Sequence, residues 1–214
     1  MSSKGATTRE RILEAACELF SEKGFVSTTT QDICGLAQAN IAGVNYHFRS
    51  KENLYREAWV HLDRLAMDRW TELIDSAESA EEKLCQFIRF RVNSVLSDGM
   101  ESRFPRIMHR EMGQPSALHE ELMENYMRKR RKWFLDLVRE IVGGALDKRQ
   151  ERMAGFCIHS PLIHLIEIHN RPEHPHRHRC HSVRKDSEAL AETLCTFALA
   201  GLRELTRQHG QKEE

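Results

Sequence analysis

Histidine and cysteine side chains gather in one stretch of the chain, where they could ligate a metal ion. Seven of the twelve histidines lie between residues 159 and 181. Imidazole and thiolate are ligands for Zn, Ni or Cu. Ligands that alternate along a loop do not define a closed tetrahedral site, so we expect no dedicated metal site and keep metal binding as an alternative. The candidate metal ligands are His174, His176, His178, Cys180 and His181.

The remaining reactive side chains do not form a pattern typical of an enzyme. No nucleophile–base arrangement, glycine-rich phosphate loop or pair of carboxylates stands out. Scattered histidines and cysteines are insufficient for a catalytic assignment. We therefore expect no catalytic residues, no cofactor and no enzymatic activity. A helical enzyme or scaffold remains the alternative.

The elements that position the uncharged segment "QANIAGVNYHF", residues 38–48, can be predicted from helix-capping residues. Thr7 with Glu10 and Thr29 with Asp32 have capping-box spacing, and Asn40 and Ser50 are further N-cap types. They predict a helix ending near Gly24, a short helix after Thr29, another over residues 41–47 and a longer one from Lys51.

Short helices are stable only when they pack against a partner. Val44 and Phe48 are expected to pack with Ile33, Leu36 and the apolar face of the first helix, which carries Leu19 and Phe20. Two short helices joined by a tight turn over a longer one form a helix-turn-helix arrangement. A purely structural three-helix subdomain is the alternative.

Apolar periodicity predicts that the rest of the chain is helical as well. Helices are expected over residues 80–98, from Pro105, from Pro115 to Ile141, over residues 147–168, and at the C-terminal end, with a loop over residues 169–182. No segment alternates long enough to form a strand. The fold class is therefore all-α, with an N-terminal three-helix bundle and a C-terminal helical domain.

Charge and composition restrict where the chain could act. The net charge is zero, and residues 1–61 carry seven basic against seven acidic side chains. Any nucleic-acid contact must then depend on a few well-placed groups, because no broad positive field exists. The chain has no apolar signal-peptide core and no apolar run long enough to span a bilayer. The six cysteines show no framework spacing, so we expect reduced thiols and a cytoplasmic protein.

The segment "GFVSTTTQDICGLAQANIAGVNYHFRSKENLY" resembles the N-terminal signature of the tetracycline-repressor (TetR) family. The later "HREMGQPSALHEEL" and "FALAGLRELT" resemble the C-terminal domain of the CecR-like subgroup. The resemblance implies an all-helical homodimer that represses transcription at a palindromic operator and is released by a small-molecule inducer. It implies a helix-turn-helix DNA-binding domain over residues 1–50 and a ligand-binding and dimerisation domain over residues 51–214, with helix 51–76 connecting them. A metal-responsive regulator that senses through the 169–181 loop is the alternative.

The resemblance makes residues 41–47 the helix that enters the major groove of the DNA. Ile41 or Ala42 could contact a thymine methyl group, and Asn45 could bind adenine through two hydrogen bonds. The small Ala42 and Gly43 would allow close approach to the bases. The phosphate contacts would come from Thr28, Thr29, Thr30, Tyr46, His47 and Lys51. The family usually has Gly and Val where this chain has Gln38 and Ala39.

Three further regions of the chain can be assigned a role. We interpret the basic run "RKRRK", residues 128–132, as a solvated helix face, with DNA contact as the alternative. A dimer is expected through the last helix and the one preceding the histidine-rich loop, involving Leu194, Phe197, Ala198, Gly201 and Leu202. A hydrophobic or aromatic inducer is expected among Phe87, Phe90, Phe104, Met108, Trp133, Phe134 and Phe156. His109, His159 and Arg91 could supply polar contacts there.

Overall fold

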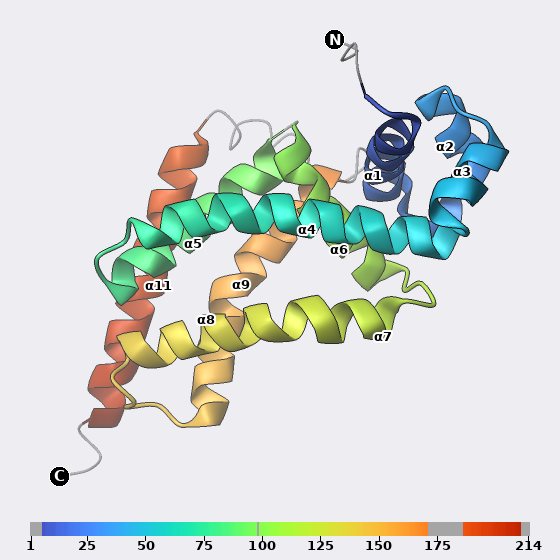
Figure 1. The fold of residues 1–214 in the computed structure, drawn as a ribbon. Helices are drawn as coiled ribbons and strands as arrows, with labels where there is room; N and C mark the ends of the chain where they lie inside the picture. The colour runs from blue at the N-terminus through green and yellow to red at the C-terminus, as the bar shows by residue number, and fades with distance from the viewer. Residues whose placement is uncertain (1–5, 98, 171–185, 211–214) are drawn as a thin grey trace. The chain divides into compact units, whose positions relative to one another are not determined.

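A computed structural model of the chain describes residues 6–97, 99–170 and 186–210. Every regular element in these residues is helical, which confirms the all-α fold (Figure 1). The helices are α1 (Thr8–Ser27), α2 (Thr30–Ala37), α3 (Ile41–Phe48), α4 (Lys51–Asp75), α5 (Ala80–Leu96), α6 (Arg103–Gly113), α7 (His119–Leu122), α8 (Arg128–Ile141), α9 (Lys148–Asn170) and α11 (Ser187–Gly210). A short 3₁₀ turn, Met100–Ser102, precedes α6, and a π-helical turn, Met123–Met127, connects α7 to α8.

Capping residues set the helix starts of the N-terminal region as predicted, whereas α1 continues past its expected end near Gly24, where the helix is kinked, to Ser27. Thr7 accepts a hydrogen bond from the Glu10 backbone N–H, and the Glu10 carboxylate accepts one from the Thr7 N–H. Thr29 and Asp32 form the same reciprocal pair at α2. At α3, Asn40 Oδ1 accepts from the Gly43 N–H at 2.7 Å. These bonds satisfy backbone donors that helix starts otherwise leave unpaired.

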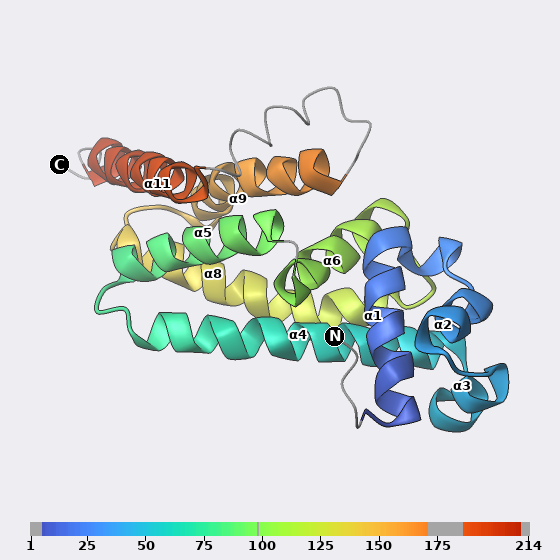
Figure 2. The ribbon, with the colours of Figure 1, turned by 90° about the horizontal axis from the view of Figure 1, so that it is seen from above.

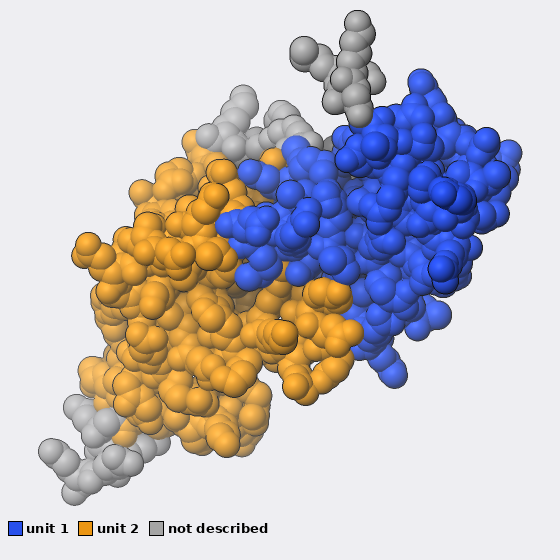
Figure 3. All heavy atoms as spheres, in the orientation of Figure 1, with its two compact units in different colours: residues 1–68, 98–123 blue, residues 69–97, 124–214 orange. Residues whose placement is uncertain are grey.

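Two compact units divide the chain and are coloured separately in Figure 3. Unit 1 consists of residues 1–68 and 98–123, and unit 2 of residues 69–97 and 124–214. Within unit 1, α6 packs along α1, and α1 also contacts α2 and α3. Unit 1 therefore extends beyond residues 1–50, the predicted DNA-binding domain, whose functional boundary stays a prediction.

The core of unit 1 fixes the two short helices against α1. Ile12, Phe20, Ile33, Val44 and Phe48 are all buried. The predicted contribution of Leu36 to this packing is wrong, because its side chain is 47% exposed. The α2 helix is only eight residues long, and its buried face is formed by Ile33, Cys34 and Ala37.

Unit 2 is built around α5, which contacts α8, α9 and α11 (Figure 2). Leu84, Ile88 and Val92 lie along one face of α5 and are buried in the core of this unit. Gly143 and Gly144, which follow α8, both have positive φ angles, so the predicted end of that helix is confirmed. Asp147 Oδ1 accepts from the N–H groups of Arg149 and Gln150 at the start of α9.

Two predicted helix starts are wrong. Pro115 was expected to begin a helix, but helical structure starts only at His119. The Ser116 N–H and hydroxyl both bond to the Glu111 carboxylate, which holds the intervening residues in a turn. The helix expected from Pro105 begins earlier, at Arg103, because proline is tolerated throughout a first helical turn.

Candidate functional site

The α3 helix presents an exposed and uncharged face to solvent. Ile41 is 50% exposed and Tyr46 is 83% exposed, and Ala42 and Asn45 are exposed as well. The buried Val44 and Phe48 hold the opposite face of α3 in the core. At this exposure Tyr46 contributes little to the core. The face therefore carries the types of side chain that read base edges.

Gly43 does not belong to this exposed face. A Cβ atom at this position would lie 3.3 Å from Asn40 Oδ1 and 3.7 Å from Ile12 Cδ1. The absence of a side chain thus allows α3 to pack closely on its own cap and on α1. Gly43 is half-buried, and its close approach to the bases stays a prediction.

The turn between α2 and α3 adopts the left-handed conformation that its position requires. Gln38 has φ 50° and ψ 47°, and the Ala39 N–H donates to the Cys34 carbonyl at 3.0 Å. Glycine is the residue that adopts this conformation at least cost. The turn therefore retains its geometry although Gln38 stands where the family usually has glycine.

Some of the side chains predicted to contact phosphates are accessible to solvent, and one is buried. Thr29 and Tyr46 are exposed, and Thr30 and His47 are half-buried. The Thr28 side chain is fully buried, and its hydroxyl donates to the Leu19 and Gly24 carbonyls. Its predicted contact to DNA is therefore wrong.

Lys51 is held in place by an aromatic ring at the start of α4. Its Nζ atom lies 4.2 Å from the centroid of the Phe25 ring, a cation–π distance. Partial burial lowers the pKa of the Lys51 ammonium below its ordinary value. Arg49 is an exposed cation directly after α3, with φ 68°, and was not among the predicted DNA contacts. Its place next to the uncharged helix was the signal that could have identified it.

An aromatic cluster lies inside unit 2 and contains four of the seven predicted ligand residues. Centroid distances of 5.1 Å for Phe87–Phe134 and 6.1 Å for Phe87–Trp133 join three of them. Trp70 connects Phe90, at 5.5 Å, and Trp133, at 4.9 Å. Trp70, which lies on α4, was not predicted as a ligand residue. We call Trp70, Phe87, Phe90, Trp133 and Phe134 the aromatic cluster.

The other three predicted ligand residues do not join this cluster. Phe104 is buried in unit 1, where its ring packs edge-on against Trp59 at 5.6 Å, and Met108 belongs to the same unit. Phe156 on α9 is 72% exposed. The expectation that Phe156 lines an interior pocket is wrong, because it lies on the outer face of its helix.

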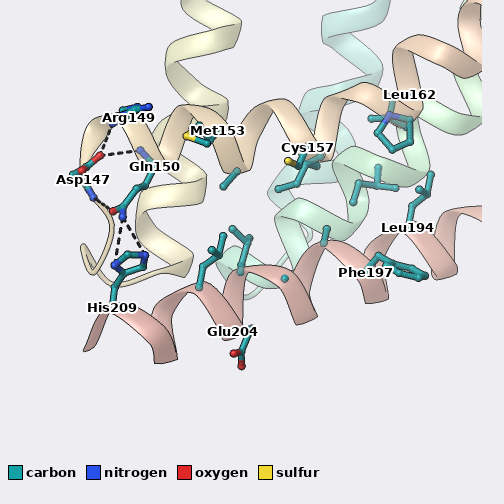
Figure 4. A pocket seen from close by; sticks show the side chains of 18 residues that line it. Asp147, Arg149, Gln150, Met153, Cys157, Leu162, Leu194, Phe197, Glu204 and His209 are labelled. Carbon is teal, nitrogen blue, oxygen red and sulfur yellow. Dashed lines mark hydrogen bonds between the residues drawn. The ribbon is translucent and has the colours of Figure 1, made fainter. Parts of the chain in front are cut away.

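A groove runs between α9 and α11 in unit 2, with a volume of about 1030 Å³ (Figure 4). All five predicted dimer residues line it, with Met153, Cys157 and Leu205. Phe197 is 75% exposed, whereas Leu202 is buried. Near one end, Gln150 Nε2 lies 3.0 Å from His209 Nε2. Phe156 and Ile163 on α9 are also exposed and apolar.

The basic run on α8 is balanced by acidic side chains of the same helical segment. Arg128 pairs with Glu124, and Lys132 pairs with Asp136, each one helical turn away. These pairs support the interpretation as a solvated face.

The five candidate metal ligands lie outside the described residues, and no group of metal-ligating side chains occurs within residues 6–97, 99–170 and 186–210. In the same part of the chain, no helix is long and apolar enough to cross a bilayer.

Two family models match the chain. The model for bacterial regulatory proteins of the tetR family matches residues 12–58. The model for the C-terminal domain of the HTH-type transcriptional dual regulator CecR matches residues 80–202, more than half of the chain.

Individual relatives share about a third of their residues with the chain, over only part of its length. The chain is similar to the HTH-type transcriptional regulator UidR of Escherichia coli, with 31% identity over 60% of this chain and 56% of that protein. It is 30% identical to the HTH-type transcriptional repressor KstR2 of Mycolicibacterium smegmatis over 38% of this chain and 40% of the relative. The matches thus span less than two thirds of these relatives.

Solved structures of similar fold cover nearly all of the chain. The fatty acid degradation regulator FadR of Bacillus halodurans has a TM-score of 0.65 and 17% identity, over 94% of this chain and 99% of that one. The ketosteroid transcriptional regulator KstR2 of Mycobacterium tuberculosis also has a TM-score of 0.65, with 18% identity, over 94% and 97% of the two chains. The chain belongs to the TetR family of DNA-binding transcriptional regulators, which are not enzymes, and carries a CecR-like C-terminal domain.

Proposed function

We propose that this regulator is a homodimeric repressor that binds a palindromic operator and is released by a hydrophobic or aromatic small molecule. The observation that carries the proposal is the exposed, uncharged face of α3, fixed from behind by Val44 and Phe48. Ile41, Ala42 and Asn45 would read bases there. We further propose that residues 1–50 form the DNA-binding domain, residues 51–214 the ligand and dimer domain, and that the protein acts in the cytoplasm.

Phosphate contacts would surround this face. Thr29, Thr30 and Tyr46 offer hydroxyl donors, and His47 and Lys51 offer nitrogen donors. Such contacts orient a protein on the duplex without distinguishing sequences. Because residues 1–61 carry no net charge, binding would depend on these few groups, and its salt dependence would be modest.

The groove between α9 and α11 supports the proposed dimer. Phe197, which lines the groove, and Phe156 and Ile163, which lie outside it on α9, remain exposed in one chain. Exposed large apolar side chains are typical of a surface that a second copy covers. Gly201 has no atom within 4 Å of where its Cβ would lie, so the helix surface there is open. Two copies related by twofold symmetry would place two α3 helices roughly 34–36 Å apart on one face of the DNA.

The aromatic cluster supports a ligand site in unit 2. Of its five members, only Phe134 is fully buried, and the other four keep part of their surface exposed. A ligand would release DNA only if it bound more tightly to a conformation in which the α3 spacing no longer fits the operator. The KstR2 relative is described as a repressor, which supports repression as the mode of action.

Footprinting of the purified protein on the DNA upstream of its own gene tests this function. We expect a protected site with two symmetric halves and preference over random duplex of equal length. Equal affinity for both DNAs in the absence of inducer would refute the proposal. The histidine-rich loop stays an alternative sensor, and a variant with His174, His176, His178 and His181 changed to Ala separates the two, because only a metal sensor would lose metal-driven release of DNA.

A further inference from the structure

Arg91 on α5 carries a charge for which the described part of the chain provides no counterion. Its Nε atom is buried without a hydrogen-bond partner, and Arg91 forms no ion pair with a described residue. Burial, together with the charge of Arg130, lowers the pKa of the guanidinium to about 10. Arg91 is therefore still protonated at neutral pH, and unit 2 retains a half-buried cation that has no counterion among the described residues.

The neighbours of Arg91 add no negative charge. Phe87 and Phe90 precede it on α5, and Arg130 contributes a second cation. The imidazole of His159, on α9, packs against the rings of both Phe134, at 4.3 Å, and Phe87, at 5.3 Å. Burial and the charge of Arg91 lower the pKa of His159 to about 4, so its imidazole is neutral at pH 7. The positive charge of Arg91 thus lies beside the aromatic cluster.

Other arginines of unit 2 show the usual arrangement. Arg139 pairs with Glu151 at 2.6 Å, and Arg203 pairs with Glu81 at 2.7 Å. Arg89, two residues before Arg91 on the same helix, pairs with Glu188 at 3.2 Å. A buried charge without such a partner is strongly unfavourable, which is why buried charges in proteins are almost always paired. Arg91 is an exception that an external anion would correct.

We propose that the small-molecule ligand of unit 2 is an organic acid, whose oxyanion binds Arg91 while its apolar body packs on the aromatic cluster. This inference rests on the proposed function, since it requires that unit 2 binds a small molecule. The planar guanidinium fits a carboxylate or phosphate through two parallel hydrogen bonds. Neutral His159 adds a nitrogen donor or acceptor without changing the charge of the site.

Three compounds that share a phenylalkyl group test whether the site prefers a carboxylate, a phosphate or an uncharged hydroxyl. They are phenylbutyrate, phenylbutyl phosphate and phenylbutanol. Binding to the full chain is followed by fluorescence quenching of Trp70 and Trp133, with Trp59 in unit 1 as a constant background, and by calorimetry. We expect at least one of the two acids to bind about ten- to a hundredfold more tightly than the alcohol, the range expected for hydrogen bonds to a charged group. Whichever of the two acids binds more tightly identifies the oxyanion of the ligand as a carboxylate or a phosphate.

Arg91→Met should abolish the preference for acids, and Arg91→Lys should restore part of it. Arg89→Met is the matched control, because it removes a paired arginine from the same helix, and it should keep the full preference. Without ligand, Arg91→Met should melt at a higher temperature than the wild type, since an uncompensated buried charge is gone. If Arg91 served only to stabilise the fold, Arg91→Met would instead melt at a lower temperature than the wild type.

Equal affinity of the wild type for acids and alcohol would overturn the inference, as would a preference that survives in Arg91→Met. Failure of the wild type to bind any of the three compounds would also overturn it. DNA binding by the same preparations, measured without these compounds, tests the proposed regulator separately. A chain that binds its operator but does not distinguish acid from alcohol would contradict the anion site alone.

Discussion

The phenol hydroxyl of Tyr55 donates a 2.6 Å hydrogen bond to Glu111 Oε2 in the interior of unit 1. Both side chains are buried. The other carboxylate oxygen accepts from the Ser116 N–H and hydroxyl and lies 3.3 Å from His119 Nδ1. Glu111 thereby joins α4 and α6 to the segment that precedes α7. Burial, followed by the bond to Glu111, raises the pKa of Tyr55 far above its ordinary value.

Tyr55→Phe should destabilise unit 1, because it leaves a buried carboxylate oxygen without its donor. The expected loss in the free energy of unfolding is about 1.5–3 kcal/mol, typical for a hydrogen bond to a charged group. Chemical denaturation of the variant measures it. Tyr46→Phe is the control, since that side chain is 83% exposed and makes no comparable bond. Equal stability of Tyr55→Phe and the wild type would show that the bond contributes nothing.

His159 should make the protein less stable in acid. Its pKa is about 4 in the folded chain and about 6.5 in the unfolded chain, so the unfolded chain binds more protons between these values. The stabilisation is complete above about pH 6.5 and is lost progressively as the pH falls towards 4. At pH 5 the loss should reach about 2 kcal/mol.

Unfolding free energies measured from pH 7 to pH 4.5 test this dependence. His159→Phe should show a flatter profile, because its ring can pack against Phe87 and Phe134 as the imidazole does, without titrating. Cap carboxylates such as Glu10 and Asp32, whose pKa values are lowered by backbone and side-chain hydrogen bonds, affect both proteins alike. His164→Gln, at an exposed position of the same helix, should retain the wild-type profile. If the unfolding free energies of the wild type and His159→Phe changed with pH in the same way, the pH dependence would not come from His159.

The local features of the fold could be predicted from the sequence because they depend on neighbouring residues. The capping boxes at Thr7 and Thr29 and the caps at Asn40 and Ser50 all occur as expected. The burial of Val44 and Phe48 follows from the same spacing, since a helix of eight residues has one face to bury.

The wrong predictions concern side chains whose exposure or location depends on tertiary packing. Thr28 has the residue type of a surface cap, but α1 is kinked at Gly24, and the Thr28 hydroxyl donates to carbonyls of α1. Phe156 belongs to an apolar helix, but periodicity alone cannot tell which apolar face meets its own chain. Phe104 and Phe87 looked equivalent in sequence, although they pack in different units.

Gly201→Glu should produce monomers. The groove between α9 and α11 would acquire a charge where the second copy is proposed to pack, and burying that charge would be costly. Sedimentation should show a loss of dimer, and operator affinity should fall with it because each monomer carries one α3 helix. Thr196→Glu is the matched control, since Thr196 is exposed on the same helix but does not line the groove. A Gly201→Glu protein that sediments as a dimer would place the interface elsewhere.

Asn45→Ala should weaken binding to the operator while hardly changing binding to random duplex. Asn45 is exposed on α3, and a two-bond contact to adenine contributes about 1–3 kcal/mol of discrimination. Lys51→Met should instead weaken binding to all sequences and reduce the slope of affinity against salt by about one ion, since it removes one phosphate contact. Competition binding at several salt concentrations measures both effects. If Asn45→Ala lowered the affinity for operator and random DNA by the same factor, Asn45 would contact the backbone rather than a base. The sequence reading by α3 would then depend on Ile41 and Ala42, whose apolar contacts distinguish thymine alone.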